Sequence, residues 1–197
     1  MNTFPRRVVA VLSFSAFLAA GAALRAQPLP EKEIYKVRML TGRAPVEPAL
    51  VEVRIEIEGW TTAEEVRAFD DILGRQGTDP FLAAYQGANK GVVRFMHSRG
   101  WNLPIHAAQV AATEKGKKVR LFLLRQTWNP GSQFATTGRY LFMAIELELN
   151  EKGKGSGRYY EDASIQLDPV AGTIVMDSYA SAPKIFPTVQ QVIKKAK

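Results

Sequence analysis

The sequence predicts a mostly β protein with a small helical insertion (α+β), in which an antiparallel meander closes as a barrel or a sandwich. Three observations lead to this fold class. Apolar and charged residues alternate strictly over residues 51–58, a capped helical pattern starts at Thr62, and short apolar runs separated by glycine-containing turns follow Gly91. Alternation with a period of two is typical of a strand with one buried face. Closure is expected because open sheet edges invite aggregation.

The first 26 residues have the order of a secretory signal peptide. Arg6 and Arg7 form a basic start, residues 8–24 carry no charge, and small residues lead to Ala26. This apolar run of 17 residues is shorter than the roughly 20 that span a bilayer, so cleavage is favoured over an uncleaved anchor. Cleavage is expected after Ala26, with Ala22 as the alternative. The mature protein is therefore expected in the periplasm or outside the cell.

Removal of this leader lowers the positive charge of the chain. The whole sequence has 26 Lys and Arg against 19 Asp and Glu, for a net charge of +7. The leader holds three arginines and no acid, which leaves 23 basic and 19 acidic residues, or +4. Such a charge is ordinary for a soluble protein, so no nucleic-acid partner is expected. The chain has no cysteine and hence no disulfide, and its mature length is sufficient for a core without one.

The segment that follows the leader, residues 27–48, is expected to be an extended lead-in, because it contains four prolines. A short strand is predicted within it at residues 34–40. The β-rich domain then spans residues 49–197 as a single unit and opens with the alternating strand at residues 51–58.

The helical insertion is predicted over residues 62–87. Thr62 and Glu65 have the spacing of a capping box, in which each side chain bonds the other residue's backbone amide. The first helix is expected to end by Gly74 or Gly77. A second short helix is predicted with Asp79 as its cap and Pro80 at its first position.

The rest of the domain is predicted to be a meander of about six strands. These strands are expected at residues 92–96, 104–113, 118–126, 140–149, 159–167 and 173–179. Turns are expected between them at residues 114–117, 150–157 and 168–172, which contain the glycines. Residues 189–193 fit either one helical turn or an extended tail.

Three tryptophans are the first candidates for ligand binding. Trp60, Trp101 and Trp128 fall on loops or strand ends, and Asn129 follows the last of them. Aromatic rings with neighbouring amides on loops suit the stacking of glycans or peptides. A structural role is favoured over ligand binding: each indole is expected to fill an end of the β core.

Basic turns are the second candidate for a binding site. Lys115 and Lys117 lie in one predicted hairpin, and Lys154 lies in another. If both hairpins leave the same end of the domain, these lysines form a cationic rim that can meet anionic lipid or polysaccharide. The alternative is that they are ordinary solvated turns.

No catalytic constellation is found in the sequence. Nucleophile motifs and metal-ligand spacings are absent, and the glycine-rich stretch at residues 153–157 lacks a phosphate-loop frame. A zinc site would need both histidines, His97 and His106, together with a carboxylate. Glu146 and Glu148 share one strand face, as glycosidase carboxylates can, but are expected to be solvated. No catalytic residue, metal ligand or cofactor is therefore assigned.

An ordered series of short motifs gives the chain a family resemblance across residues 51–194. The series consists of Gly59-Trp60-Thr61-Thr62, Ala63-Glu64-Glu65, Leu103-Pro104-Ile105, Trp128-Asn129-Pro130, Tyr140-Leu141-Phe142, Ile145-Glu146-Leu147, Lys152-Gly153-Lys154-Gly155-Ser156-Gly157 and Tyr179 before Pro183. In this series the chain resembles an uncharacterised family of small secreted bacterial proteins. The resemblance implies a shared fold and export, and it transfers no activity, cofactor or site residue.

Taken together, these patterns favour a non-enzymatic exported binding or interaction module of the cell envelope. Its expected partner is envelope polysaccharide, lipid or protein. Two other functions stay open: a carrier that holds an apolar ligand in the lumen of a β-barrel, and a hydrolase with an unrecognised site of histidine and carboxylate.

The leader gives the first testable prediction. When the full chain is expressed in a bacterial host with an intact export pathway, N-terminal sequencing of the exported protein is expected to start at Gln27 or at Ala23. Recovery of the intact chain, starting at Met1, from the membrane fraction would show that the segment is an anchor.

Overall fold

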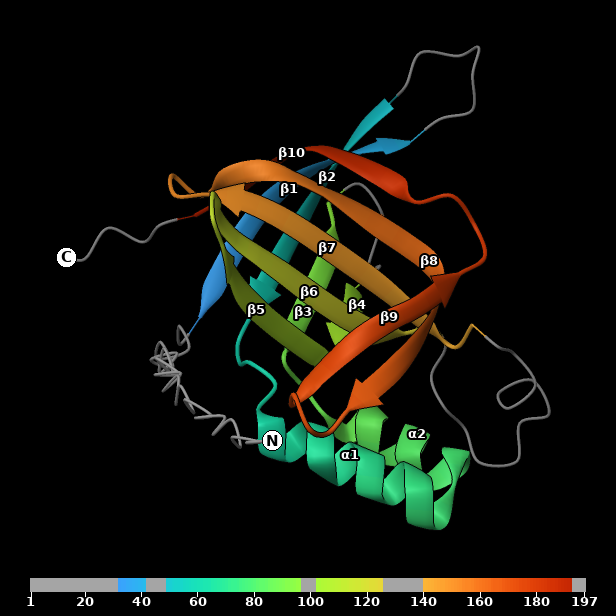
Figure 1. Cartoon of the computed structure of the whole chain (residues 1–197). Helices are drawn as coiled ribbons and strands as arrows, with labels where there is room; N and C mark the ends of the chain where they lie inside the picture. The colour runs from blue at the N-terminus through green and yellow to red at the C-terminus, as the bar shows by residue number, and fades with distance from the viewer. Residues whose placement is uncertain (1–31, 42–48, 97–101, 126–139, 193–197) are drawn as a thin grey trace, which may run out of the picture.

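The computed structural model describes residues 32–41, 49–96, 102–125 and 140–192. These residues form a mostly antiparallel β structure with two helices, which confirms the predicted α+β class (Figure 1). The strands are β1 (Glu33–Thr41), β2 (Ala49–Ile57), β3 (Gly91–Phe95), β4 (Asn102–Ile105), β5 (Ala107–Thr113), β6 (Gly116–Leu124), β7 (Phe142–Asn150), β8 (Lys154–Asp168), β9 (Thr173–Tyr179) and β10 (Lys184–Gln191). The helices are α1 (Ala63–Gln76) and α2 (Thr78–Gly87).

A single strongly curled sheet contains all the described strands (Figure 1). Its order is β4-β3-β2-β1-β10-β8-β7-β6-β5, and β9 pairs with β8 beside this path. The first half of the long strand β8 pairs with β7 and β10, whereas its second half pairs with β9. The strand predicted at residues 173–179 is confirmed as β9. The expected strand at residues 34–40 is confirmed within β1.

The predicted closure of the sheet as a barrel is wrong. The two edge strands, β4 and β5, are consecutive in the chain and are separated only by His106, so they follow each other end to end and form no ladder together. The backbone N–H of His106 donates to Phe122 O at 3.1 Å, where the chain passes from pairing with β3 to pairing with β6. The single strand expected at residues 104–113 is therefore two strands.

A connector between β2 and α1 crosses the gap between the two edges. Thr61 N–H donates to Ala108 O at 2.7 Å, and Ala108 N–H donates back to Thr61 Oγ1 at 2.9 Å. Lys90 N–H, just before β3, donates to Ile105 O at 2.7 Å. The bond from Lys90 extends the β3–β4 ladder, whereas the two bonds with Thr61 satisfy backbone groups of Ala108 that a closed ladder would otherwise have paired.

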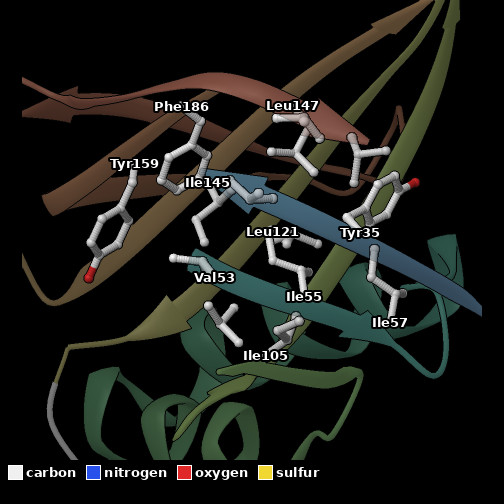
Figure 2. Packing of buried hydrophobic residues seen from close by; sticks show 14 of the residues in the cluster. Tyr35, Val53, Ile55, Ile57, Ile105, Leu121, Ile145, Leu147, Tyr159 and Phe186 are labelled. Carbon is white, nitrogen blue, oxygen red and sulfur yellow. The ribbon is translucent and has the colours of Figure 1, made fainter. Parts of the chain in front are cut away.

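The inner face of the curled sheet holds the main hydrophobic core. Side chains from widely separated strands meet there, as Figure 2 shows for Tyr35, Ile55, Leu121, Ile145 and Phe186, each at most 1% exposed. Aromatic rings from β3, β8 and β10 are in contact, because Tyr159 lies 6.3 Å from Phe95 and 6.4 Å from Phe186 between ring centroids. Side chains from opposite walls thus pack together in the interior.

A second core lies on the outer face of the sheet, where the two helices cover one end (Figure 1). Val66 and Phe69 of α1 are buried with Phe81, Leu82 and Tyr85 of α2. They pack on apolar side chains of the strands, namely Ala107, Phe122, Leu124, Phe142, Ala144, Tyr160, Ala163 and Ile174. In the described part of the chain, no helix combines the length and apolar character needed to cross a membrane.

The start of α1 has the predicted capping box. Glu65 N–H donates to Thr62 Oγ1 at 3.2 Å, and Thr62 N–H donates to Glu65 Oε2 at 2.8 Å. The helix ends at Gln76, followed by Gly77 with a positive φ of 88°. The prediction of Asp79 as the cap of α2 is wrong, because Gly77 ends one helix and caps the next. This single shared residue leaves α2 to begin at Thr78.

The glycine-rich stretch 150–157 is mostly strand, whereas a turn was predicted for all of it. Strand β8 already begins at Lys154, and only residues 151–153 turn. A Cβ atom on Gly155 would lie 1.7 Å from Glu148 O. Strands β7 and β8 therefore approach each other at this position to a distance that only glycine allows. At the C-terminal end, the described residues of the 189–193 segment are extended as the end of β10.

The capping box gives a prediction about stability. Replacing Thr62 by Ala removes one acceptor from the helix N-terminus and is expected to lower the free energy of unfolding by about 0.5–2 kcal/mol. Thr78→Ala is the matched control, because Thr78 is exposed and opens a helix without a side-chain cap, so its change is expected to stay within about 0.5 kcal/mol. Urea unfolding of both variants measures the difference, and equal midpoints would contradict the assigned role.

Candidate functional site

Two neighbouring hairpins turn at the same end of the sheet. Strands β5 and β6 are joined at Glu114 and Lys115, and strands β7 and β8 are joined through residues 151–153. Because β6 pairs with β7, with Gly116 opposite Asn150, both turns lie side by side. Strand β6 runs from this end toward the helices, so the hairpin end is the end that α1 and α2 leave open (Figure 1).

A groove lies between these hairpins and has a volume of about 620 Å³. This volume falls within the roughly 300–1,000 Å³ of typical small-molecule sites. The lining combines four lysines, two acids, three neutral polar residues, one leucine and one glycine, namely Thr113, Glu114, Lys115, Lys117, Lys118, Glu148, Leu149, Asn150, Lys154, Gly155 and Ser156. The structure thus brings together all three lysines that the sequence singled out, Lys115, Lys117 and Lys154.

Most of the groove belongs to the outer face of the sheet. Side chains alternate between faces along a strand, and Val119 and Leu121 of β6 point into the core. Lys118 and Arg120 therefore point outward, as do their cross-strand neighbours on β7 and β8. The outer face of these strands is apolar under the helices and charged at the hairpin end.

The lysines of the groove differ in how they are paired. Lys118 Nζ lies 3.1 Å from Glu146 Oε1 and 3.7 Å from Glu148 Oε1, and Arg120 Nε lies 3.1 Å from the same oxygen of Glu146. Lys115 and Lys154 are exposed and have no acidic group within ion-pair distance among the residues that the structure describes. Their charges are therefore available to a ligand.

Lys117 faces the other way and closes the end of the main core. Its Nζ lies 2.5 Å from Glu33 Oε1, and this carboxylate also accepts from Gln191 Nε2 at 2.9 Å and from the Tyr35 hydroxyl. Glu33 is only 6% exposed. Burial, together with the hydrogen bond to Glu33 and its charge, raises the pKa of the Tyr35 hydroxyl well above its usual value, so the phenol stays a donor.

Sequence reasoning missed the role of Glu33. A signal was nevertheless present, because Glu33 occupies the same face of β1 as Tyr35, Val37 and Met39, which are all buried. A charged residue at the start of an apolar face needs partners. One partner, Tyr35, is two residues away on β1, whereas Lys117 of β6 and Gln191 of β10 are far away in the sequence.

Backbone hydrogen bonds hold the second hairpin in place. Asn150 Oδ1 accepts from the amides of Lys152 and Lys154 at 3.0 and 3.1 Å. Gly153, with a φ of 69°, donates to Asn150 O and accepts from Gln191 N–H at 2.8 Å. The base of Lys154 is thereby fixed while its ammonium group stays free.

The tryptophan candidates are not brought to this groove in the described structure. Trp60 is 6% exposed and packs in the main core, so its ring face is not open to a ligand. Trp101, Trp128 and Asn129 lie outside the described residues.

The histidine candidate for catalysis is a buried polar group. His106 is 3% exposed, its Nδ1 lies 3.0 Å from Ala88 O, and its ring packs 5.6 Å from that of Tyr85. Burial holds the pKa of His106 below its usual value despite the bond to Ala88. His97 lies outside the described residues, and within them no cluster of three His, Asp or Glu could hold a metal ion.

The carboxylates on β7 are arranged for ion pairing. The side chain of Glu146 is 16% exposed and contacts Lys118 and Arg120, whereas that of Glu148 is 69% exposed. A glycosidase acid lies in an apolar pocket, whereas Glu146 is ion-paired with Lys118 and Arg120 and Glu148 is exposed. The features of the groove that can hold acidic and hydroxyl groups are instead Lys115, Lys154 and the neutral polar residues of its lining.

No family model, curated protein or solved structure matched this chain.

The burial of His106 gives a prediction about pH. Its pKa is lowered in the folded protein, so near and below pH 6.5 the unfolded chain binds the extra proton first. Stability is then expected to fall as the pH drops below about 6.5 and to level off once the pH passes the lowered pKa of the folded state.

Urea unfolding of the wild type and of His106→Asn, at several values between pH 5 and pH 7.5, measures this dependence. Asn keeps an amide that can donate to Ala88 O but does not titrate, so the variant is expected to lose that part of the slope. An unchanged slope in the variant would assign the pH dependence to other groups.

Proposed function

We propose that the protein is an exported, non-catalytic binding module that holds an acidic polysaccharide in the groove at its hairpin end. One observation carries this proposal: two neighbouring hairpins place Lys115 and Lys154, which have no acidic partner in the described part of the chain, on the lining of one groove of about 620 Å³.

The composition of the groove matches a sugar polymer that carries carboxylates. The two free ammonium groups would each meet an acidic group of the ligand. Between them, Thr113, Asn150 and Ser156 offer neutral donors and acceptors for sugar hydroxyls. Glu114 and Glu148 can accept from hydroxyls and would disfavour a ligand of uniformly high negative charge.

A polysaccharide fits this end better than a lipid surface. The two turns carry Glu114, Lys115, Glu151 and Lys152, and none of these residues can insert an apolar side chain below lipid headgroups. A concave groove also suits a chain that lies within it, whereas a membrane presents a broad surface.

The alternatives have less support in the described residues. A carrier needs internal space, and the interior of the curled sheet is occupied by packed side chains (Figure 2). A hydrolase would need His106 beside a carboxylate, and its ring is bonded to Ala88 O and packed on Tyr85. Export rests on the predicted leader.

The experiment uses the mature chain, residues 27–197, with polygalacturonate as the acidic probe and dextran as the neutral one. Calorimetric titration is expected to give binding to polygalacturonate that weakens as salt is raised, and none to dextran. The double variant Lys115→Glu, Lys154→Glu is expected to bind about tenfold more weakly, from about 1 kcal/mol or less per exposed charge pair and added repulsion.

The matched control is Lys36→Glu, Arg38→Glu. Both residues are exposed on β1, outside the groove, and the net charge changes by the same amount. Equal loss in both double variants would mean that only net charge matters, and no binding to polygalacturonate would refute the proposal.

A further inference from the structure

Strand β5 forms one edge of the sheet, and its hydrogen bonds show which of its residues face outward. Both backbone groups of Ala108 bond to Thr61 and not to β6. Successive residues of a strand direct their backbone N–H and C=O groups to opposite sides, so those of Val110 and Ala112 also point away from β6. The ladder with β6 is formed by the backbone groups of the alternate residues Gln109, Ala111 and Thr113.

Within the part of the chain that the structure describes, the outward ladder that begins at Thr61 is not continued. The N–H and C=O groups of Val110 and Ala112 have no partner among the described residues. Val110 is half-buried and packs against the main core, while Ala112 is exposed. An added strand here would gain ladder hydrogen bonds from both residues and place a side chain beside Val110.

This edge also lacks the devices that usually protect an edge strand. The opposite edge, β4, is four residues long and contains Pro104. Strand β5 has no proline and no charged residue, and its register with β6 runs without a bulge from Ala107 to Thr113. The segment from Val110 to Thr113 therefore presents a regular edge, without a bulge and with small side chains.

We infer that the β5 edge, from Val110 to Thr113, is a docking site for a short extended segment of a partner polypeptide with acidic residues at the end beside Lys115. The segment adds to the sheet as one further strand. This inference is independent of the polysaccharide groove, although the two sites adjoin at Thr113.

The charge at the end of the edge favours an acidic segment. The β5–β6 turn carries Glu114 and Lys115, and Lys154 of the neighbouring hairpin adds a second free cation, so the local charge is positive. Lys117 and Lys118 do not contribute, because they are paired with Glu33, Glu146 and Glu148.

A second copy of this chain does not fit the same edge. Two-fold antiparallel pairing that uses both Val110 and Ala112 sets residue 114 of one copy opposite Ala108 of the other. That position is already taken by Thr61. A register that avoids Thr61 pairs only Ala112 with its own copy, because the chain then enters the Glu114 turn. The open edge thus suits a short segment of a different chain.

Amide exchange measured by NMR tests the free edge first. In the mature protein alone, the amides of Ala111 and Thr113 are expected to exchange slowly, and those of Val110 and Ala112 rapidly. Slow exchange at Val110 and Ala112 would show that the edge is already covered and would overturn the inference.

Titration with the peptide acetyl-EETVTV-amide, whose glutamates lie beside Lys115 when the peptide pairs antiparallel to β5, tests docking. The peptide is expected to slow exchange at Val110 and Ala112 and to shift their resonances, while a peptide methylated on alternate backbone nitrogens is expected to do neither. Replacement of the two glutamates by lysines is expected to weaken binding. Equal binding of the methylated peptide would overturn the inference, as would a dimer that uses this edge.

Ala112→Pro removes only an outward N–H and is expected to weaken peptide binding at least about tenfold, since proline is tolerated where the N–H of an edge strand faces solvent. Ala112→Ser keeps the N–H and serves as the matched control. Both variants are expected to unfold at similar temperatures and to bind polygalacturonate equally, which separates failure of this inference from failure of the proposed function. Full peptide binding by a folded Ala112→Pro variant would overturn it.

Discussion

The structure depends on one constraint: a single curled sheet must bury apolar side chains on both of its faces. The inner face curls around a core that includes Ile55, Leu121 and Ile145. The outer face is buried only where the helices cover it, under Val66 and Tyr85. Because the helical insertion is short, the hairpin end of that outer face stays in water and carries charged side chains. The groove exists there for that reason.

Local signals in the sequence predicted local structure well. The Thr62 cap, the end of α1 before Gly77 and the strand β9 each depend on residues within a few positions, and they were predicted correctly. Closure of the sheet was predicted wrongly because it depends on His106 and Thr61, whose partners Phe122 and Ala108 lie far away in the chain. Likewise, the sequence pattern alone could not show that Gly77, and not Asp79, is the N-cap of α2.

The position of the groove could be predicted from the sequence, but the pairing of its lysines could not, for a related reason. The sequence placed the lysines in or beside hairpin turns. They lie close together because the two hairpins are neighbours in the sheet. What the pattern could not separate was Lys117 from Lys115, although they lie two positions apart. Lys117 sits on the strand face that points inward and is bound to Glu33, 84 residues away, whereas Lys115 lies in the turn. An ammonium group already paired with a buried carboxylate contributes little to an incoming anion.

The connector that begins the helical insertion also determines where the sheet stays open. Thr61 pairs with Ala108 on the edge of β5, and the next residue, Thr62, caps α1, so the chain turns away from the sheet at that point. Had the connector run farther along β5, it would have covered Val110 and Ala112 as well. The helix start and the open edge are therefore consequences of one turn. The part of β5 that no described residue covers therefore lies between that turn and the β5–β6 hairpin, next to the groove. An extended segment that adds to β5 would therefore have one end beside Lys115, so the two proposed binding surfaces share one end of the molecule.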